Sequence, residues 1–197
     1  MAAAVEHEKR RRKILEKALV VFMEDGFENA TFQKIADQCG ITRTILYLYF
    51  KNKKEIFTYS IKQFLLALEE KLNSIRNDKS IKSTEKITKV LLAIVKSAEK
   101  NKQLLYVVLD YLLHLSKNDV NPERRVLRRT IKLRHILSSM VIEGIKAGEL
   151  KKNNIKTIHD FLYSFIESAI YKIVVLKKEN LDELNETIVF AVKQIAV

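Results

Sequence analysis

A short stretch of the 197-residue sequence gathers side chains that can hydrogen-bond to a polar partner. Thr42, Arg43 and Thr44 stand at the start of a segment that continues to Tyr49, and Tyr47 follows one turn later. If this segment is a helix, its exposed face begins with these polar side chains. Arginine suits the O6 and N7 acceptors of guanine, and a helix that presents it at its N-terminal end fits the major groove of DNA. The stretch therefore indicates DNA recognition.

The residues around this stretch predict a helix-turn-helix motif over residues 32–50. Thr31 and Thr42 can cap its two helices, and Gly40 gives the turn the backbone freedom that it requires. Ala36 allows the two helices to approach closely. The apolar positions inside the motif are Ile35, Cys39, Ile41, Leu46 and Tyr49. Two short helices around a glycine also occur in helical proteins that do not bind DNA, so the motif alone leaves both interpretations open.

The remaining polar residues do not form a pattern typical of catalysis or metal binding. The four histidines include no Glu-x-x-His pair, and no serine, histidine and aspartate have a suggestive spacing. The single cysteine, Cys39, excludes an intramolecular disulfide and a cysteine-based zinc site. We therefore expect no catalytic residue, no metal and no cofactor, and we expect that the chain is not an enzyme.

The composition predicts an all-α fold. Four glycines and one proline are too few for the turns of a β fold, whereas 47% hydrophobic residues suffice for a core. The net charge of +12 suggests an anionic partner such as nucleic acid, a membrane surface or an acidic ligand. A membrane-surface protein is disfavoured because the apolar helix faces are needed for the core. No apolar run is long enough to span a bilayer, and the charged N-terminus is unlike a signal peptide, so we expect a cytoplasmic protein.

The periodicity of the apolar residues predicts about nine helices. Gly26 is expected to end the first, and Pro122 stands just inside the start of the seventh, where its missing N–H costs little. The helices are expected at about 8–25, 32–39, 43–49, 52–77, 84–100, 102–117, 122–147, 155–178 and 180–196.

Residues 12–57 resemble the TetR family of bacterial transcriptional regulators. The matching positions occur in order: Ile14, Ala18, Phe22, Gly26, Phe27, Thr31, Ile35, Ala36, Gly40, Ile41, Thr42, Leu46, Tyr47, Tyr49, Phe50 and Lys53. Thr44 replaces a frequent glycine, and Lys54 stands where an acidic residue is common. The resemblance implies an all-α protein with a three-helix DNA-binding domain at 1–52 and a larger helical effector-binding and dimerisation domain at 53–197.

The resemblance also implies roles for single residues in DNA binding. Arg43 and Thr44 are expected to read bases, and Gln33 to reach a phosphate or a base edge. Tyr49 is expected either to contact the DNA backbone or to pack in the core. The basic cluster at 9–13 is expected to be an arm that attracts phosphate, or else a solvated helix start. Phosphate contacts are expected from Thr31, Thr42, Tyr47 and Lys53.

The second domain shows no specific match beyond the family outline, which implies a homodimer through the last two helices. Their apolar side comprises Ile158, Leu162, Phe165, Ala169, Ile173, Leu176, Leu181, Leu184, Ile188 and Val192, and the alternative is burial of this side within one chain. A ligand pocket is expected around Tyr106, Asp110, Tyr111, His114 and Tyr163. Asp110 is expected to contact a ligand inside a cavity, or else to pair with a histidine or face solvent.

These observations predict a homodimeric repressor that a small-molecule effector releases from a palindromic DNA operator. Two recognition helices of a dimer face successive major grooves, which explains the palindrome. The alternative that stays open is a helix-turn-helix regulator without a small-molecule effector, which a protein partner or its own abundance controls.

Overall fold

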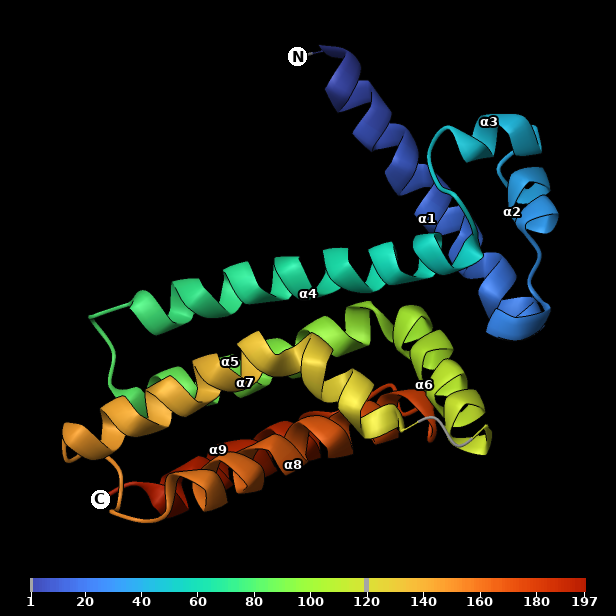
Figure 1. Ribbon diagram of the computed structural model, residues 1–197. Coiled ribbons are helices and arrows are strands. Elements are labelled where there is room, and N and C mark those ends of the chain that lie inside the picture. Colours follow the sequence, from blue (N-terminus) through green and yellow to red (C-terminus); the bar gives the residue numbers. More distant parts are fainter. Residues whose placement is uncertain (1, 119–120) are drawn as a thin grey trace. The chain divides into compact units, whose positions relative to one another are not determined.

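The computed structural model describes residues 2–118 and 121–197, apart from the side chains of residues 2–4, 122 and 125 (Figure 1). The described residues form nine α-helices and no strand, although one isolated β-bridge joins Leu150 to Ala196. The predicted all-α fold is thus confirmed. The helices are α1 (Ala2–Asn29), α2 (Phe32–Gln38), α3 (Arg43–Tyr47), α4 (Lys53–Asn77), α5 (Ser83–Lys100), α6 (Lys102–Lys117), α7 (Pro122–Lys146), α8 (Ile155–Val174) and α9 (Asp182–Ile195).

Most helices begin and end close to where the sequence predicts, but α1 begins at Ala2 rather than at about Glu8. Gly26 interrupts α1 with φ 75° and ψ 163°, a conformation that side chains with a Cβ rarely adopt, so residues 27–29 form a separate short turn. The end of α8 differs from the prediction because no glycine or proline marks it. Lys177 instead adopts a φ of 51°, and the Lys178 N–H donates to the Lys172 carbonyl at 3.0 Å. That bond closes the helix end.

The chain divides into two compact units. Unit 1 comprises Met1–Phe64 and Gln103–Pro122, and unit 2 comprises Leu65–Lys102 and Glu123–Val197. Unit 1 therefore contains α1, α2 and α3 together with the first part of α4 and most of α6. The functional boundary between residues 52 and 53 stays a prediction, because compactness does not test where DNA binding ends and effector binding begins.

An apolar core in unit 1 fixes α2 and α3 against α1. Ile35 of α2 and Leu46 of α3 are fully buried, and they belong to the same cluster as Phe22 of α1. From α4, the ring of Phe57 lies 4.8 Å from the ring of Phe27. Burying one such side chain contributes about 1.5–3 kcal/mol. The core therefore holds α3 by one face and leaves its other face in solvent.

Unit 2 buries the apolar sides of α8 and α9 within the chain, where α8 packs on α5 and α9 (Figure 1). Most of the residues that the sequence analysis placed at a dimer interface lie in this core: Ile158, Leu162, Ala169, Ile173, Leu181, Leu184, Ile188 and Val192. The prediction was wrong for these residues, because packing between helices of one chain already covers them. Of the remaining two, Phe165 is half-buried and Leu176 is exposed.

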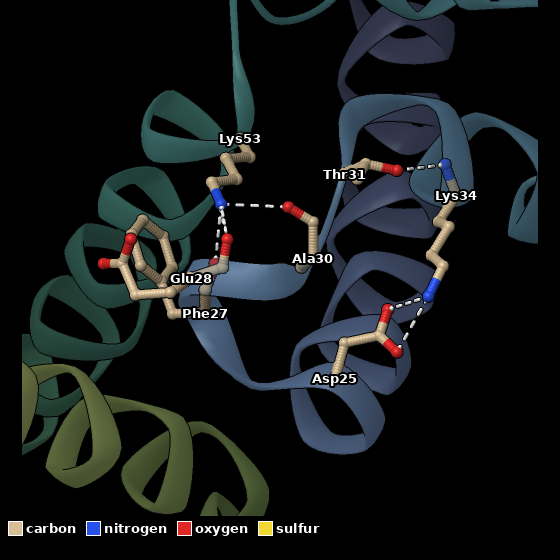
Figure 2. A network of polar contacts seen from close by, with 7 residues as sticks. All are labelled: Asp25, Phe27, Glu28, Ala30, Thr31, Lys34 and Lys53. Carbon is tan, nitrogen blue, oxygen red and sulfur yellow. Dashed lines mark hydrogen bonds and ion pairs between the residues drawn. The ribbon is translucent and has the colours of Figure 1, made fainter.

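Lys53, at the start of α4, holds the end of α1 (Figure 2). Its Nζ donates to the carbonyl oxygens of Phe27, Glu28 and Ala30 at 2.8, 2.5 and 2.9 Å. The last carbonyls of a helix have no partner within it and carry the negative end of the helix dipole, so an ammonium group suits them. An ammonium has three N–H donors, and all of them are used here. The predicted phosphate contact of Lys53 therefore has no free donor to support it.

A second contact ties α2 to α1 beside this network. Lys34 Nζ lies 2.9 Å from Asp25 Oδ2, and the Lys34 backbone N–H donates to Thr31 Oγ1 at 3.1 Å (Figure 2). The ion pair is largely exposed, so it contributes little stability by itself. Its effect is to add a second attachment of the short helix α2 to the end of α1.

We expect Lys53→Met to lower the free energy of unfolding by about 1–3 kcal/mol, because three carbonyls lose a charged donor while the apolar stem is kept. Urea unfolding followed by circular dichroism measures this change. Lys54→Met, at the neighbouring exposed lysine, is the matched control and should change the free energy of unfolding by less than about 0.5 kcal/mol. A Lys53→Met protein of unchanged stability that binds DNA weakly would contradict the capping role and restore the phosphate contact.

Candidate nucleic-acid interface

Threonine caps start both helices of the motif. The Oγ1 of Thr31 accepts the Lys34 N–H at 3.1 Å, and the Oγ1 of Thr42 accepts the Ile45 N–H at 3.2 Å. A hydroxyl that accepts in this way keeps its own proton, and both side chains are exposed. Each threonine can therefore donate to a phosphate oxygen without giving up its cap.

Arg43 and Tyr47 form a pair on the surface of α3. Arg43 Nη2 donates to Tyr47 Oη at 2.9 Å, and the guanidinium carbon lies 5.5 Å from the centre of the tyrosine ring. The Tyr47 ring packs in turn against Phe32 of α2, with ring centres 4.8 Å apart. Because arginine has five N–H donors, this pair positions the guanidinium and leaves donors for a base edge.

The structure brings most of the predicted DNA-binding residues to one exposed part of unit 1. Gln33 Nε2 donates to Asp37 Oδ1 at 2.8 Å on the surface of α2, and its carbonyl oxygen remains available as an acceptor. Six of the eight predicted residues are exposed on α2, α3 and their caps: Thr31, Gln33, Thr42, Arg43, Thr44 and Tyr47. Their roles in DNA binding stay predictions.

Tyr49 and Lys53 are the two predicted residues that are not exposed. Tyr49 is half-buried and packs against the unit 1 core, and its ring stacks on His7 of α1 with centres 4.8 Å apart. This position agrees with the core-packing alternative for Tyr49. Lys53 caps α1, so its ammonium is engaged by backbone carbonyl oxygens.

The basic cluster at 9–13 lies within α1 and divides into two kinds of side chain. The guanidinium of Arg11 packs 4.7 Å from the ring centre of Phe50 and 4.1 Å from that of Tyr59. Burial raises the pKa of the Tyr59 hydroxyl, and the hydrogen bond to Glu8 adds to this effect. The other members of the cluster, Lys9, Arg10, Arg12 and Lys13, are exposed and can attract phosphate.

Cys39, at the end of α2, is half-buried beside the motif. Burial raises the pKa of its thiol, although Lys17 opposes the effect. The thiol therefore stays protonated at neutral pH and serves as a small apolar group in the packing of α2.

Sequence reasoning missed two apolar residues on the exposed side of the motif. Leu48 is 72% exposed and Ile45 is 38% exposed, whereas Leu46 between them is completely buried. The sequence could have predicted this exposure. In a helix whose Leu46 is buried, the helical period turns Ile45 and Leu48 away from the core. Their position at a DNA-reading helix makes them candidate contacts.

Four of the residues predicted to line a ligand pocket, Tyr106, Asp110, Tyr111 and His114, lie on α6 in unit 1. Asp110 of α6 is exposed and accepts the Phe27 N–H at 3.4 Å, and His114 Nε2 lies 3.5 Å from Glu28 Oε1. This position agrees with the alternative in which Asp110 faces solvent, and its carboxylate contacts the backbone at the end of α1. Tyr106 is exposed as well, and the Tyr111 ring packs 4.8 Å from Phe27.

Tyr163 of α8 belongs to unit 2, whereas the other four predicted pocket residues belong to unit 1. The guanidinium carbon of Arg134, from α7, lies 3.7 Å from the centre of the Tyr163 ring, and the ring of His159 stacks on the same tyrosine at 5.7 Å. His159 Nδ1 lies 3.0 Å from Asp160 Oδ1, and this hydrogen bond lowers the pKa of Asp160. Arg134 Nε and His159 Nε2 are buried without a hydrogen-bond partner among the described residues.

The described residues contain neither a helix suited to cross a membrane nor a cluster of metal-ligating side chains. Within residues 2–118 and 121–197, no helix combines the length and the apolar character that crossing a membrane requires. In the same ranges, no group of three or more histidine, cysteine, aspartate or glutamate side chains is placed to hold a metal ion.

Comparison with known proteins connects this geometry to a family. Residues 14–59 match the family model described as bacterial regulatory proteins, tetR family. The fatty acid metabolism regulator protein of Bacillus subtilis is 27% identical over 165 residues, which are 80% of this chain and 80% of that protein. The transcriptional repressor KstR2 of Mycolicibacterium smegmatis is 25% identical over 162 residues, which are 82% of this chain and 76% of that protein.

Solved structures support the same fold over nearly the whole chain. The Bacillus subtilis regulator FadR, solved in complex with stearoyl-CoA, aligns with a TM-score of 0.76 and 22% identity, covering 92% of this chain and 96% of that one. This likeness shows the fold, while the match over the motif and the curated relatives concern regulators of transcription rather than enzymes. Residues 14–59 thus match the TetR family of bacterial transcriptional regulators, and over most of its length the chain is similar to regulators of transcription.

Proposed function

We propose that the chain is a homodimeric repressor that binds a palindromic DNA operator and leaves it when a small-molecule effector binds. The observation that carries the DNA-binding part is the exposed polar surface of α2 and α3, where two threonine hydroxyls and the Arg43–Tyr47 pair lie together. A regulator with this role works where the DNA is, which places it in the cytoplasm. We keep the predicted division of labour, with DNA binding in residues 1–52 and effector binding and dimerisation in residues 53–197.

In this proposal the contacts to DNA divide into two kinds. Thr31, Thr42 and the exposed arginines of the α1 cluster bind phosphates, which fixes the position of the protein without reading sequence. Arg43 and Thr44 read base edges in the major groove, where arginine recognises guanine best. Lys53 no longer belongs to the phosphate contacts, because its ammonium is used by the end of α1.

Selection of bound sites from random duplex DNA near physiological salt tests the DNA-binding proposal, and we expect enrichment of a two-fold symmetric site. Arg43→Ala should then weaken binding to that site by about 1–3 kcal/mol and relax the preference at one base pair per half-site. Arg12→Ala is the contrasting variant and should weaken binding to every sequence while lowering the salt slope by about 1 for each phosphate that the protein no longer neutralises. If the two variants behave alike, the assignment of base and phosphate roles is wrong.

A second copy of the chain is the proposed partner of the exposed apolar residues on α8 and α9. The residues are Phe161 and Tyr171 of α8, Val175 and Leu176 directly after its end, and Phe190 of α9, which the packing within the chain leaves in solvent. Val189, Phe190 and Lys193 of α9 also line a shallow hollow of about 370 Å³. Large apolar side chains that are exposed near one another are typical of protein–protein interfaces, so these residues favour contact with a second copy of the chain.

We expect Phe190→Asp to weaken the dimer at least tenfold, because it places a charge in an apolar interface. Sedimentation equilibrium measures the dimer dissociation constant. Leu113→Asp is the matched control, since Leu113 of α6 is 64% exposed and Phe190 is 63% exposed. A Phe190→Asp protein that remains as dimeric as the Leu113→Asp protein would move the interface away from this part of α9.

The effector is proposed from the relatives and from unit 2. One curated relative is named a regulator of fatty acid metabolism, and the FadR structure holds stearoyl-CoA. We propose an effector of the same chemistry, with a long acyl chain and an anionic head group. The buried and unpartnered Arg134 Nε provides a donor for such a head group, and His159 Nε2 provides another when its ring is charged.

The end of α1 offers a route from effector binding to DNA binding inside unit 1. The α4 residue Lys53 and the α6 residue Asp110 both bind the backbone that follows Gly26. A shift of either helix therefore moves the segment that carries α2 and α3. An effector that favours the shifted arrangement lowers the affinity for the operator, and the coupling is reciprocal.

We expect the operator to lower the affinity for stearoyl-CoA by the same factor by which stearoyl-CoA lowers the affinity for the operator, about 5–150-fold. Titration calorimetry with and without saturating operator measures both. Arg134→Gln should weaken stearoyl-CoA binding. Lys132→Gln, on the same helix as Arg134, removes an exposed ion pair with Glu69 of α4 and should leave stearoyl-CoA binding unchanged. Equal affinity with and without operator contradicts the coupling. No binding at all rejects this effector class and favours the alternative regulator that a protein partner or abundance controls.

A further inference from the structure

The face of α3 that lies furthest from the core of unit 1 is largely apolar. Successive residues of a helix are rotated by about 100°, so Thr44 and Leu48 each lie about 200° around the axis from Leu46. Leu46 is completely buried and Leu48 is 72% exposed, as this rotation requires. The backbone keeps helical dihedral angles at Leu48, with φ −67° and ψ −20°. Thr44 and Leu48 therefore form the outermost pair of side chains on this helix.

The polar pair on α3 lies to one side of this face. Arg43 and Tyr47 are bound to each other at 2.9 Å, and Tyr47 rests on Phe32, so both are drawn towards α2. Ile45 is exposed on the opposite flank. What the helix presents first to a partner is consequently the side chains of Thr44 and Leu48.

A single exposed leucine on a protein surface needs no explanation, but this one has apolar neighbours. Ile45, Tyr47 and Leu48 are all large, partly apolar and exposed within four successive residues. Exposed apolar groups gathered in one place mark binding surfaces. In the major groove of DNA, the apolar group available to such a surface is the 5-methyl group of thymine.

We propose that Leu48, together with the methyl group of Thr44, reads the 5-methyl group of a thymine in each half of the operator. This inference rests on the proposed function and adds a specificity determinant to it, beside the guanine contact of Arg43. The thymine methyl group would pack against the Leu48 side chain and the Thr44 methyl group. The contact therefore gains its free energy from the burial of apolar surface, without a hydrogen bond.

The test uses the operator that the selection experiment enriches and replaces its thymines, one symmetric pair at a time, by deoxyuridine, which lacks only the 5-methyl group. For the unchanged protein, replacing the contacted pair of thymines should lower the affinity about four-fold per half-site and about fifteen-fold for the whole site. This is the effect of no longer burying about one methyl group in each half-site. Fluorescence anisotropy measures each dissociation constant.

The Leu48→Ala protein should bind the thymine site more weakly than the unchanged protein and should lose most of its sensitivity to deoxyuridine at that pair. Leu48→Met keeps an aliphatic side chain and should retain the sensitivity. Leu113→Ala is the control for removal of a similarly exposed leucine from α6 and should change neither affinity nor sensitivity. Because Leu48 is exposed, the variants should keep the far-ultraviolet circular dichroism and the unfolding midpoint of the unchanged protein.

Two results overturn the inference while the proposed function stands. One is a symmetric site at which no deoxyuridine pair lowers the affinity, and the other is a Leu48→Ala protein that keeps the full sensitivity. Selection that enriches no symmetric site overturns the proposed function, and with it this inference. The selection experiment therefore distinguishes failure of the proposed DNA-binding function from failure of the proposed thymine contact.

Discussion

The position of the DNA-binding helices depends on how the end of α1 is held. Gly26 breaks the helix with a positive φ, and the carbonyl oxygens that follow have no partner of their own in the helix. Lys53 supplies the missing donors from α4, while Asp110 binds the Phe27 N–H from α6. Because α2 starts only a few residues later, these contacts set its direction together with the apolar core that packs Ile35 against α1. The apolar core then fixes α3 relative to α2.

The sequence predicts most of this fold because the helix ends carry local signals. Threonine caps start α2 and α3, a glycine interrupts α1, and a proline opens α7. The end of α8 shows where such reasoning stops. Lys177 takes up a left-handed conformation that lysine seldom adopts, and a backbone hydrogen bond from Lys178 to Lys172 closes the helix there without a residue type that would signal it.

The functional surface is less predictable than the fold, because a pattern of apolar residues does not say what covers them. The spacing on α8 and α9 predicted a buried stripe correctly but could not tell a core within one chain from an interface between two. The same limit applies to charge. Lys53 and Asp110 have residue types suited to an anion and a ligand, but the structure uses both to bind backbone groups near Gly26. The exposed face of α3 was predictable from the period of the helix, and Leu48 was missed because polar groups are the usual sign of DNA recognition.

The hydrogen bond between Arg43 and Tyr47 has a consequence for the entropy of recognition. A free arginine side chain samples many rotamers, and ordering it costs up to about 2 kcal/mol. Tyr47, itself held against Phe32, restricts these rotamers before any DNA is present. The guanidinium then reaches a guanine with little further ordering, and it cannot adapt to another base without first leaving the tyrosine. A restrained arginine thus discriminates between bases through its limited freedom as much as through the bonds that it forms.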